Sequence, residues 1–335
     1  MNNDVRNNTL DVAKGLGIWL VIVGHASQWG NPALAKYIYS FHMPFFFMIS
    51  GYLYKKRTTK ETAINGISRL IIPYFIIGLS CAIPAVIFGY VETPQDFIKR
   101  AIGTVYSVPK SDWTYFCTPI WFLTCLFCTE VIYSVLRRLN SHVKHIAVVA
   151  LFCAGLLAFH LCGTIFSPWN ILNALLGIFF YHLGAMIRTK DYFTGSESTI
   201  RTAVMMVPTA FVFWYGSINS DTFVNLSAGI TGNVFYFLIA SISGAILVLQ
   251  MATILRFVSP LKTFGRNTII LLGYNYWVMA LGNHFALSTQ GWVASLALQV
   301  PFYFLLCWLS EKNKYVSFAF KRTPITDRPS NQPNN

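Results

Sequence analysis

Three ionisable side chains fall within the first apolar stretch of the sequence, namely Asp11, Lys14 and His25. Lys14 and His25 are eleven residues apart, which in an α-helix is about three full turns at roughly 100° per residue, so they share a face. Asp11 lies about 40° from His25 around the same helix, and the rise from Lys14 to His25 is roughly 16 Å. The spacing therefore predicts a polar stripe with a cation towards one end and an imidazole towards the other.

A second histidine, His42, falls near the start of the next apolar stretch. Because the connection between the two stretches is short, we expect His25 and His42 to lie at similar depth on neighbouring helices. Histidine is the side chain best matched to proton transfer near neutral pH, so this pair is the first candidate for acid–base chemistry. Packing or a simple hydrogen bond is an alternative role for His42.

A metal site is the weaker interpretation, because two histidines without a third ligand of known depth make a poor zinc site. The other five histidines are scattered along the chain: His142, His145, His160, His182 and His284. Cys125 and Cys128 form a C-x-x-C pair within an apolar stretch, with no second pair, which favours small-residue helix packing over metal or redox chemistry. The sequence therefore predicts no metal.

The composition of the chain that carries these residues fits a lipid bilayer. Of the 335 residues, 55% are hydrophobic and 11% are charged, and the mean hydropathy is +0.51. A soluble protein carries roughly 25% charged residues to solvate its surface, whereas a surface that faces lipid is apolar. The net charge of +13 sits in short clusters between apolar stretches, so we interpret it as a topology signal and expect no nucleic-acid partner.

The apolar stretches predict an all-α, polytopic transmembrane bundle of about ten helices, since a span needs roughly 20 mostly apolar residues. The expected spans are residues 10–28, 37–54, 70–91, 119–136, 146–163, 169–187, 202–218, 230–253, 267–285 and 291–309. With the N-terminus inside, the inner segments hold 20 of the 25 Lys and Arg residues, the outer segments hold four, and Lys14 lies in the first span. This bias predicts that both termini are cytoplasmic.

Two segments outside the spans carry expectations of their own. Residues 1–310 are expected to form one transmembrane domain, and residues 311–335, polar with an end rich in Pro and Asn, a disordered cytoplasmic tail. The longest outer loop, residues 92–118, includes Trp113 and Tyr115. It is expected to be an interfacial lid or re-entrant loop, or else part of an aromatic belt at the membrane surface.

Glu130 is the one formal charge inside a predicted span besides Asp11 and Lys14. A charge within the membrane is costly and is by default a functional hypothesis. The sequence shows no partner for Glu130, and a hydrogen bond between helices explains it about as well as a substrate contact does.

Several segments resemble the acyltransferase 3 family of bacterial membrane O-acyltransferases, especially its fucose 4-O-acetylase-like branch. The matching text is LDVAKGLGIWLVIVGH (10–25), YIYSFHMPFFFMISGYLYKK (37–56), SRLIIPY (68–74), PIWFLTCLF (119–127) and LKTFGRNTIILLGYNYW (261–277). The family's Lys/Arg-x10-His motif maps onto Lys14 and His25. Two departures stand out: Gly66 replaces the first member of a basic pair of which only Arg69 is kept, and Asn275 stands in the neighbourhood where many relatives carry a histidine.

The resemblance implies a transfer reaction at the bacterial cytoplasmic (inner) membrane. The donor would be acetyl-CoA or another acyl-CoA, and the acceptor a hydroxyl of a surface polysaccharide or lipid-linked sugar. Arg69 would contact a phosphate of the donor or serve as a topology anchor. Lys14, paired with Asp11, would hold the pantetheine end or orient the stripe. His25 would be a general base or become acylated itself.

Trp121 would suit the face of a sugar, although an aromatic belt explains it as well. A different class, a transporter or exporter of a small solute or acyl group, remains an alternative for a helical bundle with a polar stripe. The lack of a visible inverted repeat and the few charges within the spans favour the enzyme.

Overall fold

The computed structural model describes residues 8–28, 30–164, 166–188, 199–285 and 291–320, apart from the side chains of residues 284 and 285. Across these ranges every named element is a helix, and the only further feature is an isolated bridge between Asn225 and Ile230. The predicted all-α class is therefore confirmed.

Seven helical stretches in the described ranges are long and apolar enough to cross a bilayer. They are α1 (Asn8–Ser27), the run Thr59–Ile87, the run Thr118–Leu136 that contains α7 (Trp121–Leu136), α8 (Ser141–Cys162), the run Pro168–Arg188 that contains α9 (Ile171–Arg188), α11 (Val234–Ile254) and α14 (Gly291–Lys312). Two other expected spans correspond to α10 (Thr199–Ile218) and α13 (Thr268–Phe285), which are not among the seven. A multi-pass bundle is thus supported, whereas the count of ten spans and the cytoplasmic side of the termini stay predictions.

The stretch 37–54, expected to be one span, is divided between two helices. These are α2 (Pro32–Tyr39) and α3 (His42–Tyr52). The chain turns at Ser40, whose hydroxyl donates to the Tyr37 carbonyl at 2.7 Å and whose carbonyl accepts from the Ser241 hydroxyl at 2.7 Å. Such hydrogen bonds between side chains and the backbone compete with the backbone hydrogen bonds of a helix. A hydropathy pattern does not reveal them, so it does not predict the break. Helix α3 rises only about 16 Å, about half of a hydrocarbon core of roughly 30 Å.

The third expected span, residues 70–91, belongs to a longer helical run. The run comprises α4 (Thr59–Gly66), a π-helical turn (Ile67–Ile71) and α5 (Ile72–Ile87). Thr58 and Glu61 form a capping box at its start, each side chain accepting from the other residue's backbone N–H. A π turn is rare and is frequent at functional sites, and this one contains Arg69.

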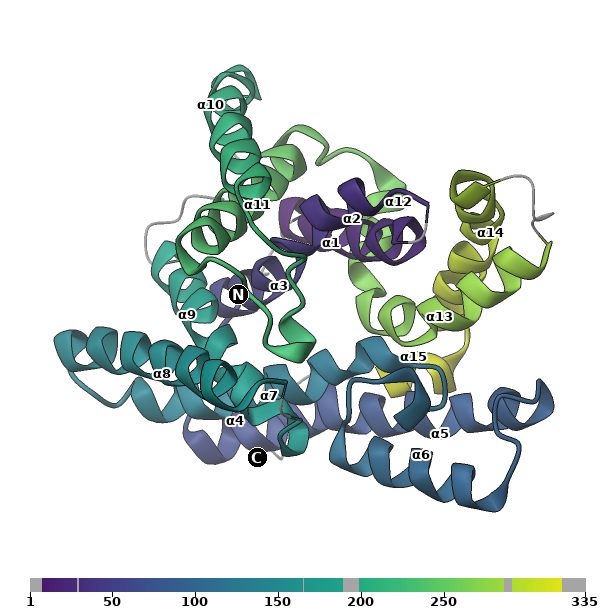
Figure 1. Cartoon of the computed structure of the whole chain (residues 1–335). Coiled ribbons are helices and arrows are strands. Elements are labelled where there is room, and N and C mark those ends of the chain that lie inside the picture. The colour runs from purple at the N-terminus through teal and green to yellow at the C-terminus, as the bar shows by residue number, and fades with distance from the viewer. Residues whose placement is uncertain (1–7, 29, 165, 189–198, 286–290, 321–335) are drawn as a thin grey trace, which may run out of the picture.

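Helix α1 lies near the middle of the bundle (Figure 1), where it contacts α2, α3, α11, α13, α14 and the short α12 (Ser259–Arg266). Its buried residues include Val12, Ile18 and Ile22. Helix α10, in contrast, packs mainly on α11 and stands at the edge of the molecule (Figure 1). Its apolar side chains, such as Ile200 and Val207, are exposed. The charged stripe thus lies on a central helix, and the exposed outer helix is apolar. This arrangement suits a bundle that lipid surrounds.

Two glycines let α1 and α12 approach with their backbones in contact. A Cβ on Gly15 would collide with the carbonyl of Leu261, and a Cβ on Gly265 would collide with the carbonyl of Asp11. Small residues at such crossings permit close packing of membrane helices. The crossing holds α12 against the start of α1, and so it brings Arg266 to Asp11.

Residues 311–320, expected to belong to a disordered tail, are helical. Helix α14 continues to Lys312, and α15 (Lys314–Phe320) follows it. Val316 and Phe320 pack on the apolar core, and α15 contacts α5. These contacts of partly buried apolar side chains hold α15 against the core, although the overall polarity of residues 311–335 is typical of a disordered tail. The remainder of the predicted tail, residues 321–335, lies outside the described residues.

Candidate active site

A cavity of about 410 Å³ lies beside the C-terminal half of α1, and we name it the histidine cavity. Its wall contains the predicted residues His25, His42 and Trp121 together with Tyr39 and Tyr276. The rest of its polar lining consists of hydroxyl, amide, amino and carboxyl groups: Gln28, Lys110, Ser111, Asp112, Thr118, Asn225 and Ser227. His25 and His42 therefore line one cavity from two elements that contact each other, α1 and α3, whereas their similar depth in the membrane stays a prediction.

A second cavity, of about 210 Å³, lies beside the N-terminal half of α1, and we name it the lysine cavity. Lys14 and Arg69 are its charged residues. The remaining wall is mostly apolar, with Phe46 and Phe122 among its aromatic side chains. An apolar pocket with two cations in its wall suits a ligand that has both an anionic part and a less polar arm.

Three side chains line both cavities, and we name Val21, Met43 and Leu272 the neck. They are 2%, 7% and 8% exposed, so buried apolar side chains separate the two cavities. Along α1, Val21 lies roughly 10 Å beyond Lys14 and roughly 6 Å before His25. The two cavities therefore meet inside the bundle, on the neck's two sides.

His25 is held through one of its two ring nitrogens. Nδ1 lies 2.8 Å from the Tyr39 hydroxyl and 3.4 Å from the Tyr276 hydroxyl, and both phenol rings meet the imidazole edge-on. Gln28 donates to the Tyr39 hydroxyl at 2.7 Å. His25 lines the histidine cavity, and no described residue hydrogen-bonds its Nε2. Nε2 is thus the nitrogen available to a substrate.

His42 stands at the first position of α3, just after the break in the chain. Its Nδ1 donates to the Ile38 carbonyl at 3.0 Å, because a carbonyl oxygen only accepts. Its ring meets that of Tyr39, with ring centroids 4.7 Å apart. Tyr39 therefore lies between the two histidines. A part for His42 in proton transfer stays a prediction.

Four consecutive residues of α13 bond to four different parts of the molecule. The hydrogen bonds join Tyr274 to Ser80 at 2.6 Å, Asn275 to Tyr303 at 2.7 Å, Tyr276 to His25 at 3.4 Å, and Trp277 to the Tyr115 carbonyl at 3.3 Å. Successive helical side chains point roughly 100° apart. These bonds therefore fix the rotation of α13 about its axis and hold Tyr276 beside His25.

Asp11 is buried and accepts from two cations, Lys14 at 3.0 Å and Arg266 at 3.4 Å. Its predicted pairing with Lys14 is confirmed, since residues three apart on a helix are neighbours. The pairing with Arg266 was not predicted, because it joins the first helix to the short α12 far along the chain. Lys14 thus keeps a fixed position while its side chain lines the lysine cavity.

Arg69 and Glu130, predicted as separate contacts to a phosphate and a substrate, are partners in an ion pair of 2.8 Å. The sequence shows no partner for Glu130 and leaves open a contact between helices or a contact to substrate. The ion pair supports the contact between helices, because α4 and the π turn pack against α7. Gly66 stands at this crossing, where a Cβ would collide with the ring of Phe127. The Arg69 side chain remains 34% exposed and lines the lysine cavity, so its proposed contact to the donor stays a prediction.

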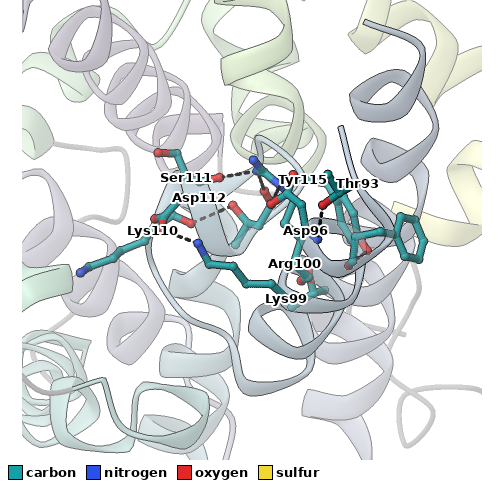
Figure 2. Close-up of polar contacts among 11 residues, drawn as sticks. Thr93, Asp96, Lys99, Arg100, Lys110, Ser111, Asp112 and Tyr115 are labelled. Atoms are coloured by element: carbon teal, nitrogen blue, oxygen red, sulfur yellow. Dashed lines mark hydrogen bonds and ion pairs between the residues drawn. The ribbon is translucent and has the colours of Figure 1, made fainter. Parts of the chain in front are cut away.

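The segment between α5 and α7 is a folded loop (Figure 2). It contains α6 (Pro94–Tyr106) and two short 3₁₀ turns, Ser111–Trp113 and Thr118–Ile120. Arg100 bonds Asp96 at 3.2 Å and the Thr114 carbonyl at 2.6 Å, and Lys99 pairs with Asp112 at 3.0 Å. These bonds connect α6 to the segment that forms the rim of the histidine cavity.

The middle of this loop enters the protein. Tyr115 and Cys117 are 2% and 0% exposed, which favours the re-entrant interpretation over a surface belt. Asp112 stays at the rim, where partial burial works to raise its pKa. The hydrogen bond and charge of Lys99, a backbone hydrogen bond and the charge of Lys110 together outweigh burial and hold the pKa below its usual value. The rim carboxylate is therefore ionised at neutral pH.

Two of the histidines expected to be scattered are in contact. Nδ1 of His145 lies 2.7 Å from Nε2 of His182, whose Nδ1 lies 3.1 Å from the Tyr133 hydroxyl. This chain lies away from both cavities. The described part of the chain holds no group of three or more His, Cys, Asp or Glu side chains that would bind a metal ion.

Sequence reasoning missed Gln28, Tyr39 and Tyr276, which surround His25. A local signal exists for two of them, because Gln28 follows His25 by three residues and Tyr39 precedes His42 by three. Tyr276 is 251 residues from His25, so only the packing of α13 against α1 identifies it.

Comparison with known proteins identifies the protein family to which this helical chain belongs. Residues 7–311 match the family described as "Acyltransferase domain", so the chain belongs to the acyltransferase 3 family, as its motifs predict. Nodulation protein NolL of Mesorhizobium japonicum is similar, at 29% identity over 154 residues. That alignment covers 40% of this chain and 37% of NolL, so the chain spans well under half of the relative's length. No solved structure matches the chain.

Proposed function

We propose that this protein is a membrane O-acyltransferase of the bacterial inner membrane. It would move an acetyl or other short acyl group from cytoplasmic acyl-CoA to a hydroxyl of a cell-envelope or lipid-linked glycan. The observation that carries the proposal is the pair of cavities along α1, with His25 in one, Lys14 and Arg69 in the other, and the neck between them. Membership of the acyltransferase 3 family supplies the reaction class.

The lysine cavity is the proposed donor site. Lys14 and Arg69 attract the anionic acyl-CoA, and the guanidinium of Arg69 suits a phosphate. A volume of about 210 Å³ is smaller than the roughly 300–1,000 Å³ of pockets that enclose drug-sized ligands. We therefore assign it the pantetheine arm and leave the nucleotide among the basic segments at that end of the bundle.

The histidine cavity is the proposed acceptor site. Its hydroxyl, amide and carboxyl groups are suited to sugar hydroxyls, and Trp121 offers an aromatic face to the sugar ring. The rim carboxylate of Asp112 and the amide of Asn225 come from two different loops. Polar groups that converge from several segments provide the orientation that one reacting hydroxyl requires.

The open nitrogen of His25 is placed for acid–base catalysis. Nε2 takes the proton of the acceptor hydroxyl while its oxygen attacks the thioester carbonyl. The new C–O bond forms, the C–S bond breaks, and the proton passes to the sulfur of the departing CoA. Such catalysis contributes about 10²–10⁴-fold to a rate. An acyl-His25 intermediate is a second route that uses the same nitrogen.

The arrangement of two cavities also favours a second candidate, transport of a small solute or acyl group. A transporter keeps its binding site near the middle of the membrane and alternates access to it from the two sides. Two cavities separated by the apolar neck would suit such a path for a solute. The two functions differ in whether a covalent product forms.

The test is incubation of the purified protein in lipid nanodiscs with acetyl-CoA labelled in the acetyl group and with glycans extracted from the cell envelope. An enzyme places label in a glycan, and mass analysis then identifies the acylated hydroxyl. A transporter leaves the glycans unlabelled and moves solute across sealed vesicles. Unlabelled glycans together with intact acetyl-CoA would count against the proposed enzyme.

A further inference from the structure

The neck is made of residues from three different elements. Val21 belongs to α1, Met43 follows His42 in α3, and Leu272 lies in α13 one turn before Tyr276. Each carries a side chain without polar hydrogen-bonding groups, and each is under 10% exposed. The reacting group of any donor held in the lysine cavity must pass between these three side chains to reach His25.

The surroundings of the neck restrict what an acyl chain can contact. At the moment of reaction the thioester carbonyl lies beside Nε2 of His25, and the pantetheine arm runs back through the neck. Beyond His25 the cavity wall carries Gln28, Asp112 and Asn225, and the acceptor fills that space. A long alkyl chain there would remove water from polar groups without satisfying their hydrogen bonds. The apolar lining shared by the two cavities, through which the acyl group has to pass, is the neck itself.

We propose that the neck selects the acyl group by length and restricts the donor to acetyl-sized thioesters, with Met43 as the specificity-determining residue. The proposal rests on the proposed function, because it concerns the acyl group that passes from the lysine cavity to the histidine cavity. The transfer forms one C–O bond and breaks one C–S bond, and His25 passes the proton of the acceptor hydroxyl to the departing CoA sulfur.

Met43 is the residue best placed to set this limit. Its unbranched thioether is the most adaptable of the three side chains, so it closes the neck when empty and packs on a short acyl group when filled. Met43→Ala removes the end of that side chain, which is about the volume of the additional carbons of a butyryl group. Met43→Leu keeps the volume nearly unchanged.

The experiment uses the full-length protein in nanodiscs with the extracted envelope glycans as acceptor mixture. The donors are acetyl-, propionyl-, butyryl- and hexanoyl-CoA, and the measurement is kcat/KM for each. We expect the wild type to prefer acetyl over butyryl by about tenfold or more, the discrimination that one or two methylenes provide in an apolar site. Met43→Ala should shift the butyryl-to-acetyl ratio by about tenfold towards butyryl.

Two controls separate a local effect from a general one. Met43→Leu should keep the ratio within about threefold of the wild type, because such swaps preserve volume. Met186→Ala makes the same substitution on the exposed part of α9, outside both cavities, and should leave the activity and the ratio unchanged. If Met43→Ala does not fold, Val21→Ala enlarges the neck from α1 and should raise the propionyl-to-acetyl ratio instead.

Two results would overturn the inference while leaving the proposed function intact. One is a wild type that uses butyryl-CoA as well as acetyl-CoA. The other is an unchanged ratio in folded Met43→Ala or, where that variant does not fold, in Val21→Ala. A wild type that transfers no acyl group from any of the four donors instead refutes the proposed function itself.

Discussion

The two ends of α1 are held by different kinds of contact. His25 is held by uncharged hydroxyls, those of Tyr39 and Tyr276. Lys14 is held by the carboxylate of Asp11, which Arg266 also contacts. Neutral hydrogen bonds orient an imidazole without fixing its charge, which suits a group that must gain and lose a proton. Ion pairs keep their charges in place, which suits an end that receives an anion.

The largest effect on activity should come from removing the imidazole of His25, at the C-terminal end of α1. His25→Ala should lower kcat for acyl transfer by about 10²–10⁴-fold, because it removes the proposed general base. Expression and membrane insertion should be unaffected, since the alanine keeps the helix. The measurement is transfer rate normalised to folded protein. His160→Ala, an exposed histidine on α8, is the matched control, and equal activity in the two variants would remove His25 from the chemistry.

Removing the charge of Lys14, near the N-terminal end of α1, should instead lower the affinity for the acyl-CoA donor. Lys14→Gln should raise KM for acetyl-CoA by about tenfold or more, since a hydrogen bond to a charged group contributes about 1.5–3 kcal/mol. Asp11 keeps Arg266 as a partner, so the free energy of unfolding should change little. Lys14→Arg keeps the charge and should retain more affinity. Near-native affinity in Lys14→Gln would leave Lys14 as a membrane anchor only.

Variants of the Arg69–Glu130 pair can distinguish a contact that stabilises the fold from a contact that binds the donor. Either Arg69→Gln or Glu130→Gln alone should lower the free energy of unfolding by about 1–2 kcal/mol, because the pair is only partly buried. The double variant should regain part of that stability. If Arg69 also contacts the donor, KM for acetyl-CoA stays high in the double variant. A KM that recovers together with stability would reduce Arg69 to the role of a helix-to-helix contact.

The smallest effects should come from the hydroxyls around His25. Tyr39→Phe should lower kcat by about three- to tenfold, the cost of one hydrogen bond of about 0.5–1.5 kcal/mol, and should leave KM for acetyl-CoA unchanged. Tyr276→Phe should cost less, because its hydroxyl lies 3.4 Å from Nδ1 and that of Tyr39 lies 2.8 Å away. Steady-state kinetics of both variants give the test, and a raised KM with an unchanged kcat would contradict a positioning role at the histidine end.

The sequence alone determined the properties that follow from overall composition or from the geometry of a single helix. The apolar stretches predicted a helical membrane protein, and the motifs predicted the family. The spacing of Asp11, Lys14 and His25 predicted a shared helix face, and the Asp11–Lys14 pair formed as expected. Helical geometry repeats every few residues, so side chains within one helix have positions that their spacing specifies.

Only the tertiary structure decided which distant residues meet. Arg266 reaches Asp11 because two glycines let α12 cross α1, and Glu130 meets Arg69 because a π turn packs against α7. Tyr276 reaches His25 through the fixed rotation of α13. Each of these contacts depends on how two helices pack, and apolar helices of the same composition pack in many ways. Small residues and a few polar contacts choose among those packings, and neither can be inferred from the hydropathy of one helix.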